Sequence, residues 1–194
     1  RLLGEAGWKL SGGMLRHQTT GEAMTAEFLS YDSSFDRIVL PYQANLAKLG
    51  IRLDIRNVDA TQYEERLKRY DFEMITYVYA QSHAPGNELR DNFGSVAADR
   101  PASRNRIGIK NPAVDALIEE VIYAPDRARV IAAARALDRV LMWSHSIVPQ
   151  WYNADNWIVH ANRLGRPAQM PSQEPGWLAA WWIKPQAEAG AKRP

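Results

Sequence analysis

The stretch that decides the fold runs from residue 26 to residue 56 and reads AEFLSYDSSFDRIVLPYQANLAKLGIRLDIR. Residues 26–31 predict a short strand, and the Asp and Ser residues at 32–34 are typical of the cap that opens a helix. Apolar residues then recur at helical spacing as far as Gly50, which is placed to end the helix. Residues 51–56 alternate apolar and charged side chains, as a half-buried strand requires. The stretch therefore predicts strand, helix, strand.

The alternation of strand and helix continues toward the carboxyl end. Asp59 and Gln62 stand three residues apart, as in a capping box that opens a second helix, and residues 72–79 predict a third strand. Such alternation is typical of parallel strands joined by right-handed crossovers, and the binding crevice of such a sheet lies beyond the carboxyl ends of its strands. We therefore expect an α/β fold, with the loop after Tyr79 beside the binding site.

A long polar segment and two helices come next. Residues 81–110 are rich in Gly, Pro, Ser, Asn and Arg, with one short helix predicted around residues 88–93. A loop of this length beside a strand end favours a functional role. Asn111-Pro112 then predicts the start of a helix, and a second helix begins at about Asp126. Apolar stripes on both helices predict an antiparallel pair that packs on the sheet.

The carboxyl-terminal part of the chain is rich in Trp. Residues 147–152 and 157–160 predict two extended segments. Trp143 and Trp151 are predicted to lie in the core. Three further Trp residues come after a Pro-Gly turn and are predicted to be exposed where they cover another domain. They are Trp177, Trp181 and Trp182.

The composition excludes several classes of function. The chain has 194 residues, of which 24 are basic and 22 acidic, and the charges are scattered without the basic stripe typical of nucleic-acid binding. No apolar stretch approaches the roughly 20 residues that a transmembrane helix needs. Cysteine is absent, which excludes disulfides and thiolate chemistry. We expect neither a membrane span nor a nucleic-acid partner.

The sequence contains no local motif for catalysis or metal binding. The four histidines lack the paired spacing of metal ligands, and neither a Gly-x-Ser-x-Gly elbow nor a phosphate-binding glycine loop is present. Glu119-Glu120 is interpreted as part of a solvated helix face. The sequence therefore predicts no catalytic residue, no metal and no cofactor. A small α/β hydrolase with dispersed catalytic residues is the alternative from another class.

The candidate ligand-binding residues gather at the end of the third predicted strand and in the loop after it. Aromatic faces and amide groups of this kind suit the capture of an extended peptide through its backbone. The other interpretation is that the two tyrosines pack under the long helices and the rest forms a polar turn. The sequence leaves both interpretations open. The candidates are Tyr77, Tyr79, Gln81, Ser82, His83 and Asn87.

Several stretches, taken in order, resemble the carboxy-terminal lobe of family 5 extracellular solute-binding proteins, the oligopeptide, dipeptide and nickel-binding group. They run through nearly the whole chain and comprise residues 41–51, 70–74, 103–105 with Gly108, 111–118, 135–141 and 147–149. Within the family, residues 82–88, with 103–105 and 136–139, look most like the Yej-type branch, which is associated with peptide import.

The resemblance implies a lobe of the type II periplasmic-binding-protein fold, with a mixed, largely parallel sheet flanked by helices. It implies an α/β ligand-binding lobe over residues 1–167, a return segment over 168–184 toward an amino-terminal lobe that this chain lacks, and a flexible tail over 185–194. The expected function is peptide capture in the periplasm for the permease subunits of an ABC importer. A sugar, an opine or a nickel chelate is the alternative cargo.

One departure from the family concerns the amino terminus of the ligand. Better-known oligopeptide binders carry an aspartate in the loop after the matching strand, and Ser82 stands at that position here. We expect the negative charge that meets the amino terminus of the ligand to come from Glu88 or from the other lobe. The resemblance also suggests that Lys68 or Arg69 approaches a ligand carboxylate, although a solvated helix end is the simpler interpretation.

Overall fold

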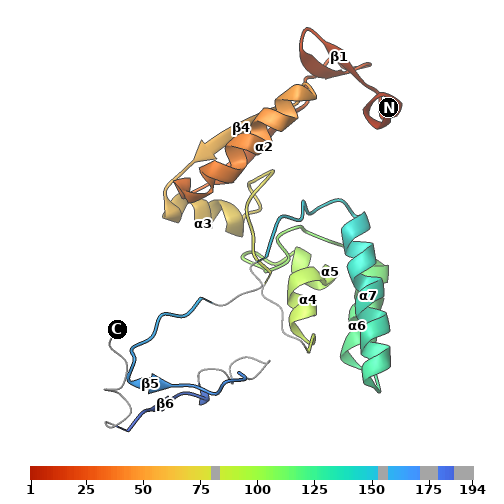
Figure 1. The fold of residues 1–194 in the computed structure, drawn as a ribbon. Helices are drawn as coiled ribbons and strands as arrows, with labels where there is room; N and C mark the ends of the chain where they lie inside the picture. Colours follow the sequence, from red (N-terminus) through yellow and green to blue (C-terminus); the bar gives the residue numbers. More distant parts are fainter. Residues whose placement is uncertain (80–83, 153–156, 171–178, 186–194) are drawn as a thin grey trace. The chain divides into compact units, whose positions relative to one another are not determined.

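The computed structural model describes residues 1–79, 84–152, 157–170 and 179–185. The contacts divide the chain into two units, residues 1–146 and residues 147–194. Figure 1 shows the course of the chain through each unit.

A helix and a hairpin open the first unit. Helix α1 (Leu2–Glu5) is followed by β1 (Trp8–Ser11) and β2 (Met14–His17), which pair antiparallel. The backbone N–H of Leu15 attaches the hairpin to the turn at Gly50, because it donates to the Gly50 carbonyl at 2.7 Å. Gly50 has a φ of +79°, and a Cβ there would lie 2.8 Å from the Leu15 nitrogen. Only glycine fits this position.

The strand, helix and strand predicted from residues 26–56 are confirmed. Strand β3 (Thr25–Ser30) pairs in parallel with β4 (Arg52–Asn57), and α2 (Asp36–Lys48) connects them after the 3-10 turn η1 (Ser33–Phe35). The carboxylate of Asp32 accepts a hydrogen bond from the Ser34 N–H at 2.8 Å, which caps the turn as predicted. The predicted second helix is α3 (Ala60–Lys68), capped by Asp59, which accepts from the Gln62 N–H at 2.9 Å.

Helices bury both faces of this strand pair. Phe28 of β3 packs with Val39 of α2 in one apolar cluster, and its neighbour Leu29 packs with Tyr63 and Leu67 of α3 in another. Successive residues of a strand point to opposite faces, so α2 and α3 cover opposite sides of the sheet. This is the layered arrangement expected for an α/β fold.

The third predicted strand, residues 72–79, is reduced to a single parallel bridge between Phe28 and Met74. Two features explain the difference. The Glu73 carboxylate accepts a hydrogen bond from the backbone N–H of Glu27. In a longer strand pairing this N–H would have bonded to a backbone carbonyl of the third strand. Beyond Met74 the chain leaves the sheet, because Tyr79 packs against a separate helical core.

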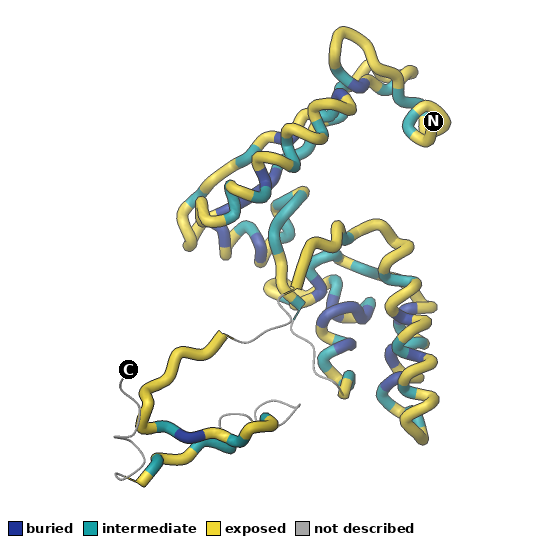
Figure 2. The backbone as a smooth tube through the Cα atoms, in the orientation of Figure 1, coloured by how far each residue is buried: buried dark blue, intermediate teal, exposed yellow. Residues whose placement is uncertain are grey.

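That core is built by α4 (Glu88–Phe93), α6 (Pro112–Ile122) and α7 (Arg127–Trp143), and the short helix α5 (Ser95–Ala98) follows α4. Asn111, predicted to open α6, accepts from the Ala113 N–H, and Asp126, where the second helix was predicted to begin, caps α7 by accepting from the Arg129 N–H. Figure 2 shows buried residues on the inner sides of these helices. Their cluster contains Leu89 and Phe93 of α4 but no described residue of β3 or β4. The expectation that α6 and α7 pack on the sheet was therefore wrong, because α4 and the loop before α6 cover their apolar stripes.

Trp143 and Trp151 were predicted to be buried but are 73% and 61% exposed. Trp143 lies at the end of α7, and α7 is 17 residues long against 11 for α6. The last turns of α7 therefore extend beyond the helix that covers the rest of it.

In the second unit β5 (Leu164–Gly165) pairs antiparallel with β6 (Trp182–Ile183). No strand forms at residues 147–152 or within 157–160, in contrast to the prediction. Apolar side chains of both segments, including Val148 and Trp157, are exposed, so these segments have no buried face. Trp182 is 48% exposed, and Trp177 lies outside the described residues.

Candidate functional site

Tyr77 and Tyr79 come after the bridge at Met74 and belong to one aromatic group. The ring of Tyr77 meets the ring of Tyr79 edge-on, with centroids 4.8 Å apart and an interplanar angle of 73°. Tyr79 in turn contacts Phe93 of α4, with centroids 5.1 Å apart. Tyr77 is 38% exposed. Tyr79 therefore packs with the helices, while Tyr77 offers part of its ring to solvent.

The phenol of Tyr79 keeps its proton over the whole physiological range. Burial and, to a lesser extent, Tyr77 raise its pKa to about 12, against the opposing effect of the Arg106 charge. A half-buried phenol that stays protonated is a hydrogen-bond donor. The group suits the binding of a carbonyl or carboxylate oxygen.

The polar candidates are only partly described. Asn87 is exposed at the start of α4, where its Oδ1 accepts a hydrogen bond from Arg90 Nη1 at 2.7 Å. Glu88, considered as a substitute for the missing aspartate, accepts from the Gly86 N–H at 2.9 Å. Gln81, Ser82 and His83 lie outside the described residues. The structure thus brings Tyr77 and Tyr79 together and leaves the loop candidates as predictions.

An ion pair joins α4 to α6 next to Asn87. The guanidinium of Arg90 donates from Nε to Glu119 Oε1 at 2.7 Å and from Nη2 to Glu119 Oε2 at 2.5 Å, and it lies over the Tyr123 ring. The hydrogen bond from Arg90 lowers the pKa of the Glu119 carboxyl. Glu120 pairs with Arg129 at 2.9 Å. Glu119 and Glu120 thus lie on an exposed helix face, as interpreted from the sequence, and both hold neighbouring segments together.

The loop before α6 is organised around Asn105, which is fully buried. Its Nδ2 donates to the carbonyls of Gly94 and Ile109, and its Oδ1 accepts from the Ile109 N–H, each at 3.0 Å. One amide thereby satisfies three backbone groups, as a buried polar side chain must. This explains the Ser103-Arg104-Asn105 stretch quoted for the family resemblance, whose role was not predictable from local spacing.

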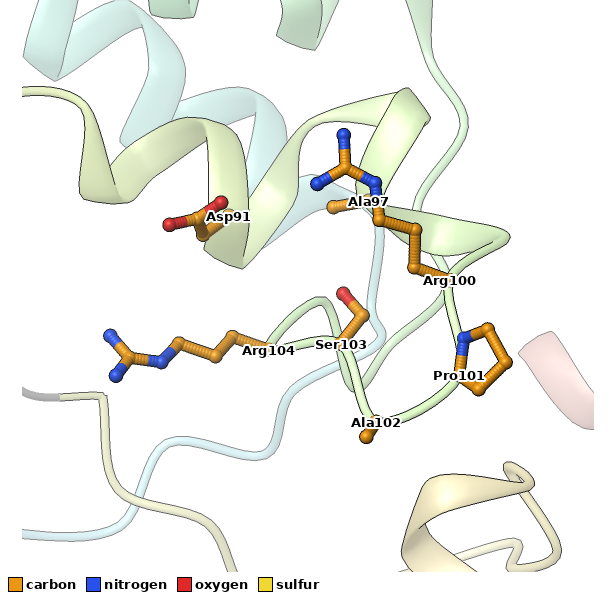
Figure 3. A pocket seen from close by; sticks show the side chains of 7 residues that line it. All are labelled: Asp91, Ala97, Arg100, Pro101, Ala102, Ser103 and Arg104. Carbon is orange, nitrogen blue, oxygen red and sulfur yellow. The ribbon is translucent and has the colours of Figure 1, made fainter.

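The same loop lines an open depression of about 400 Å³, which sequence reasoning missed. Figure 3 shows its lining: the Arg100 side chain lies beside Ala97, whereas the charged ends of Asp91 and Arg104 extend in the same direction. The only signal in the sequence is the presence of three arginines between residues 100 and 106. The depression is polar and carries more positive than negative charge.

Lys68 and Arg69 lie at the carboxyl end of α3, where a contact with a ligand carboxylate was suggested. Lys68 Nζ pairs with Glu65 at 2.7 Å, and Arg69 Nε donates to the Glu65 carbonyl at 3.3 Å. Within the described part of the chain no group of three His, Asp or Glu side chains could hold a metal ion. No helix there is long and apolar enough to cross a membrane.

A parallel strand pair between helices, with an aromatic segment after the bridge at Met74, is the arrangement of a lobe of the type II periplasmic-binding-protein class. Structures of that class share the fold. An oligopeptide-binding protein, AppA, from Bacillus subtilis in complex with a nonapeptide aligns with a TM-score of 0.64 and 20% identity over 75% of this chain and 29% of that chain. A periplasmic oligopeptide-binding protein from Thermotoga maritima, solved with mannohexaose bound, aligns with a TM-score of 0.67 and 22% identity over 78% of this chain and 30% of that chain.

Residues 1–100 match the model of the bacterial extracellular solute-binding proteins, family 5 Middle, and the chain belongs to this family. It is 46% identical to a probable peptide-binding protein, YejA, from Agrobacterium fabrum over 94% of this chain and 30% of that protein. It is 32% identical to a peptidoglycan-binding protein, YepA, from the same organism over 93% of this chain and 29% of that protein. The chain thus spans about 30% of the length of these relatives.

Proposed function

We propose that this chain is one part of the substrate-binding subunit of an ABC importer, which captures peptides in the periplasm and delivers them to permease subunits in the inner membrane. The observation that carries the proposal is the 46% identity to a probable peptide-binding protein over 94% of the chain. The family is one of solute-binding proteins, so binding without turnover is the expected activity.

The aromatic group supports a role in binding the ligand. Tyr77 is 38% exposed and is held against Tyr79, so its ring is oriented before a ligand arrives. A rigid aromatic face contributes contact area at little entropic cost, and it does not depend on the side chains of the peptide. We infer that Tyr77 contacts the ligand directly, together with the loop residues Gln81, Ser82 and His83.

The boundaries that we propose within the chain rest on the same relationship to a longer protein. We propose that residues 1–167 form one wall of the ligand cleft, that residues 168–184 return toward the other lobe, and that a tail comes last. The chain spans 30% of its relative, which leaves ample length for a second lobe in the whole protein.

Another cargo is the second candidate. The oligopeptide-binding protein from Thermotoga maritima was solved with mannohexaose bound, so the fold accepts a sugar. Titration calorimetry of the full-length protein separates the two. Peptides of two to nine residues should bind in the micromolar range or tighter, and oligosaccharides of similar length should not. Sugar binding in the absence of peptide binding would overturn the proposed cargo.

A further inference from the structure

The open depression beside the loop before α6 is built by elements other than those that carry Tyr77 and Tyr79. Its lining residues belong to α4, to α5 and to the loop over residues 100–104, and none of them belongs to a strand or to residues 75–79. Figure 3 shows the side chains of Arg100 and Arg104 extending from this loop in different directions. The binding crevice of a parallel sheet lies beyond the ends of its strands, so the depression needs a separate explanation.

Arg100 and Arg104, the rim arginines, have no carboxylate partner in the described part of the chain. Both are exposed, and neither takes part in an ion pair of those residues. Asp99, next to Arg100 in the sequence, pairs with Lys110 at 2.5 Å instead. Among the lining residues only Asp91 is acidic, so one carboxylate stands against two guanidinium groups and the depression has a net positive charge.

The loop that carries the rim arginines is held in a fixed shape by the end of α3. The N–H of Ala102 donates to the Lys68 carbonyl at 3.2 Å. Arg106 Nη1 donates to the Leu67 carbonyl at 3.3 Å. Ala102 has a φ of +59°, a left-handed conformation that residues other than Gly rarely adopt, and such a conformation persists only where surrounding contacts impose it. Arginines on a fixed loop lose less entropy on binding than arginines on a mobile one.

A carboxylate side chain of another protein fits this combination of charge and shape. Water satisfies an isolated exposed guanidinium, but two guanidinium groups beside one hollow also bind a carboxylate through charge-assisted hydrogen bonds. A hollow admits a side chain that projects from a partner, whereas attraction to an anionic membrane requires a cluster of cations that faces a flat surface. Asp91 repels an anion on its own side of the lining, which restricts where the partner's carboxylate enters.

We propose that the depression is a docking site for an acidic segment of another protein, whose Asp or Glu side chains bind at the rim arginines, Arg100 and Arg104. The inference rests on the proposed function, in which this partner is a permease subunit of the importer. Exposed charge pairs of this kind contribute mainly to the association rate and to the choice of partner. A contact of moderate strength suits a subunit that must bind and release its transporter in every cycle.

The test uses the full-length protein and the permease and ATPase subunits of its importer in phosphatidylcholine vesicles. The protein, saturated with Ala-Ala-Ala, is titrated into these vesicles, and the rate of ATP hydrolysis gives the protein concentration for half-maximal stimulation. The rim variant combines Arg100→Glu and Arg104→Glu. The control variant combines Arg127→Glu and Arg135→Glu, which reverse two exposed charges of α7. Calorimetry with Ala-Ala-Ala measures the peptide affinity of each variant separately.

Both variants should bind Ala-Ala-Ala as the wild type does. The rim variant should need roughly tenfold more protein for half-maximal stimulation, and the control variant should match the wild type. An unchanged concentration in the rim variant, an equal shift in the control variant, or weaker peptide binding by the rim variant would overturn the inference and leave the proposed function intact. A shift confined to vesicles that also contain phosphatidylglycerol would overturn it in favour of the membrane surface. Absence of stimulation by the wild type would contradict the proposed function and, with it, this inference.

Discussion

The ring of Tyr77 packs edge-on against the ring of Tyr79, with centroids 4.8 Å apart, yet the two side chains serve different parts of the molecule. Tyr79 continues into the helical core through Phe93, whereas Tyr77 is 38% exposed. Tyr77 is thus available to a ligand, and Tyr79 holds the ring of Tyr77 in place.

Substitutions at the two tyrosines should therefore separate binding from stability. Tyr77→Ala should weaken peptide binding by roughly tenfold with little change in melting temperature, because it removes an exposed ring face. Tyr79→Ala should lower the free energy of unfolding by roughly 2–4 kcal/mol, because it leaves a cavity beside Phe93. Titration calorimetry and thermal unfolding of the full-length protein measure both. Equal effects of the two variants on stability would contradict the division.

Asn105 should be among the most sensitive polar positions of the chain. Asn105→Ala leaves the Gly94 carbonyl and both backbone groups of Ile109 without their partner in a buried site. The expected loss in the free energy of unfolding is roughly 2–3 kcal/mol. Asn87→Ala, at an exposed position, is the matched control and should change stability by less than about 0.5 kcal/mol. Urea unfolding compares the two, and similar midpoints would show that the loop does not depend on Asn105.

The ion pair between Arg90 and Glu119 should make stability depend on pH in a defined window. The pKa of Glu119 is lowered from 4.5 in the folded state by the Arg90 hydrogen bond, so the folded protein favours the charged carboxylate. The pair stabilises fully above pH 4.5 and loses its effect as the pH falls through the lowered pKa. Wild type should exceed Glu119→Gln in melting temperature at about pH 7, and the difference should shrink below about pH 4.5. Persistence of the full difference at about pH 3, or its presence in an Arg90→Gln background, would argue against the pair.

From the family resemblance we expect Ser82 at the position where better-known oligopeptide binders carry an aspartate, and its replacement tests this alignment. Ser82→Asp in the full-length protein should strengthen binding of free-amino peptides relative to acetylated ones by roughly 1–3 kcal/mol. Matched free-amino and acetylated peptides are titrated into the wild type and into the variant. An unchanged ratio in a variant that still binds would mean that residue 82 does not meet the ligand terminus.

Local chemistry made much of the fold predictable. Each of the caps Asp32, Asp59, Asn111 and Asp126 binds a backbone N–H two or three residues away, so sequence spacing alone identifies them. The parallel pairing of β3 and β4 agrees with the helix between them and with the alternation at residues 51–56. Signals of this kind do not depend on the rest of the molecule.

Features that depend on distant residues were not predictable. The third strand ends early because Glu73 takes the N–H of Glu27, 46 residues away. Asn105 and Arg106 acquire their roles from Gly94 and Leu67, which lie 11 and 39 residues from them. Trp143 was assigned to the core from its residue type, whereas its exposure depends on the relative lengths of α6 and α7.

We propose that this chain supplies one wall of a peptide site that the rest of a longer protein completes. The test is to titrate one peptide, such as Ala-Ala-Ala, into the full-length protein and into residues 1–194 under the same conditions. The full-length protein should bind with a Kd in the micromolar range or below, and residues 1–194 should bind at least about 100-fold more weakly, because half of the contact surface and the exclusion of water are lost. Equal affinity of the two would contradict the claim.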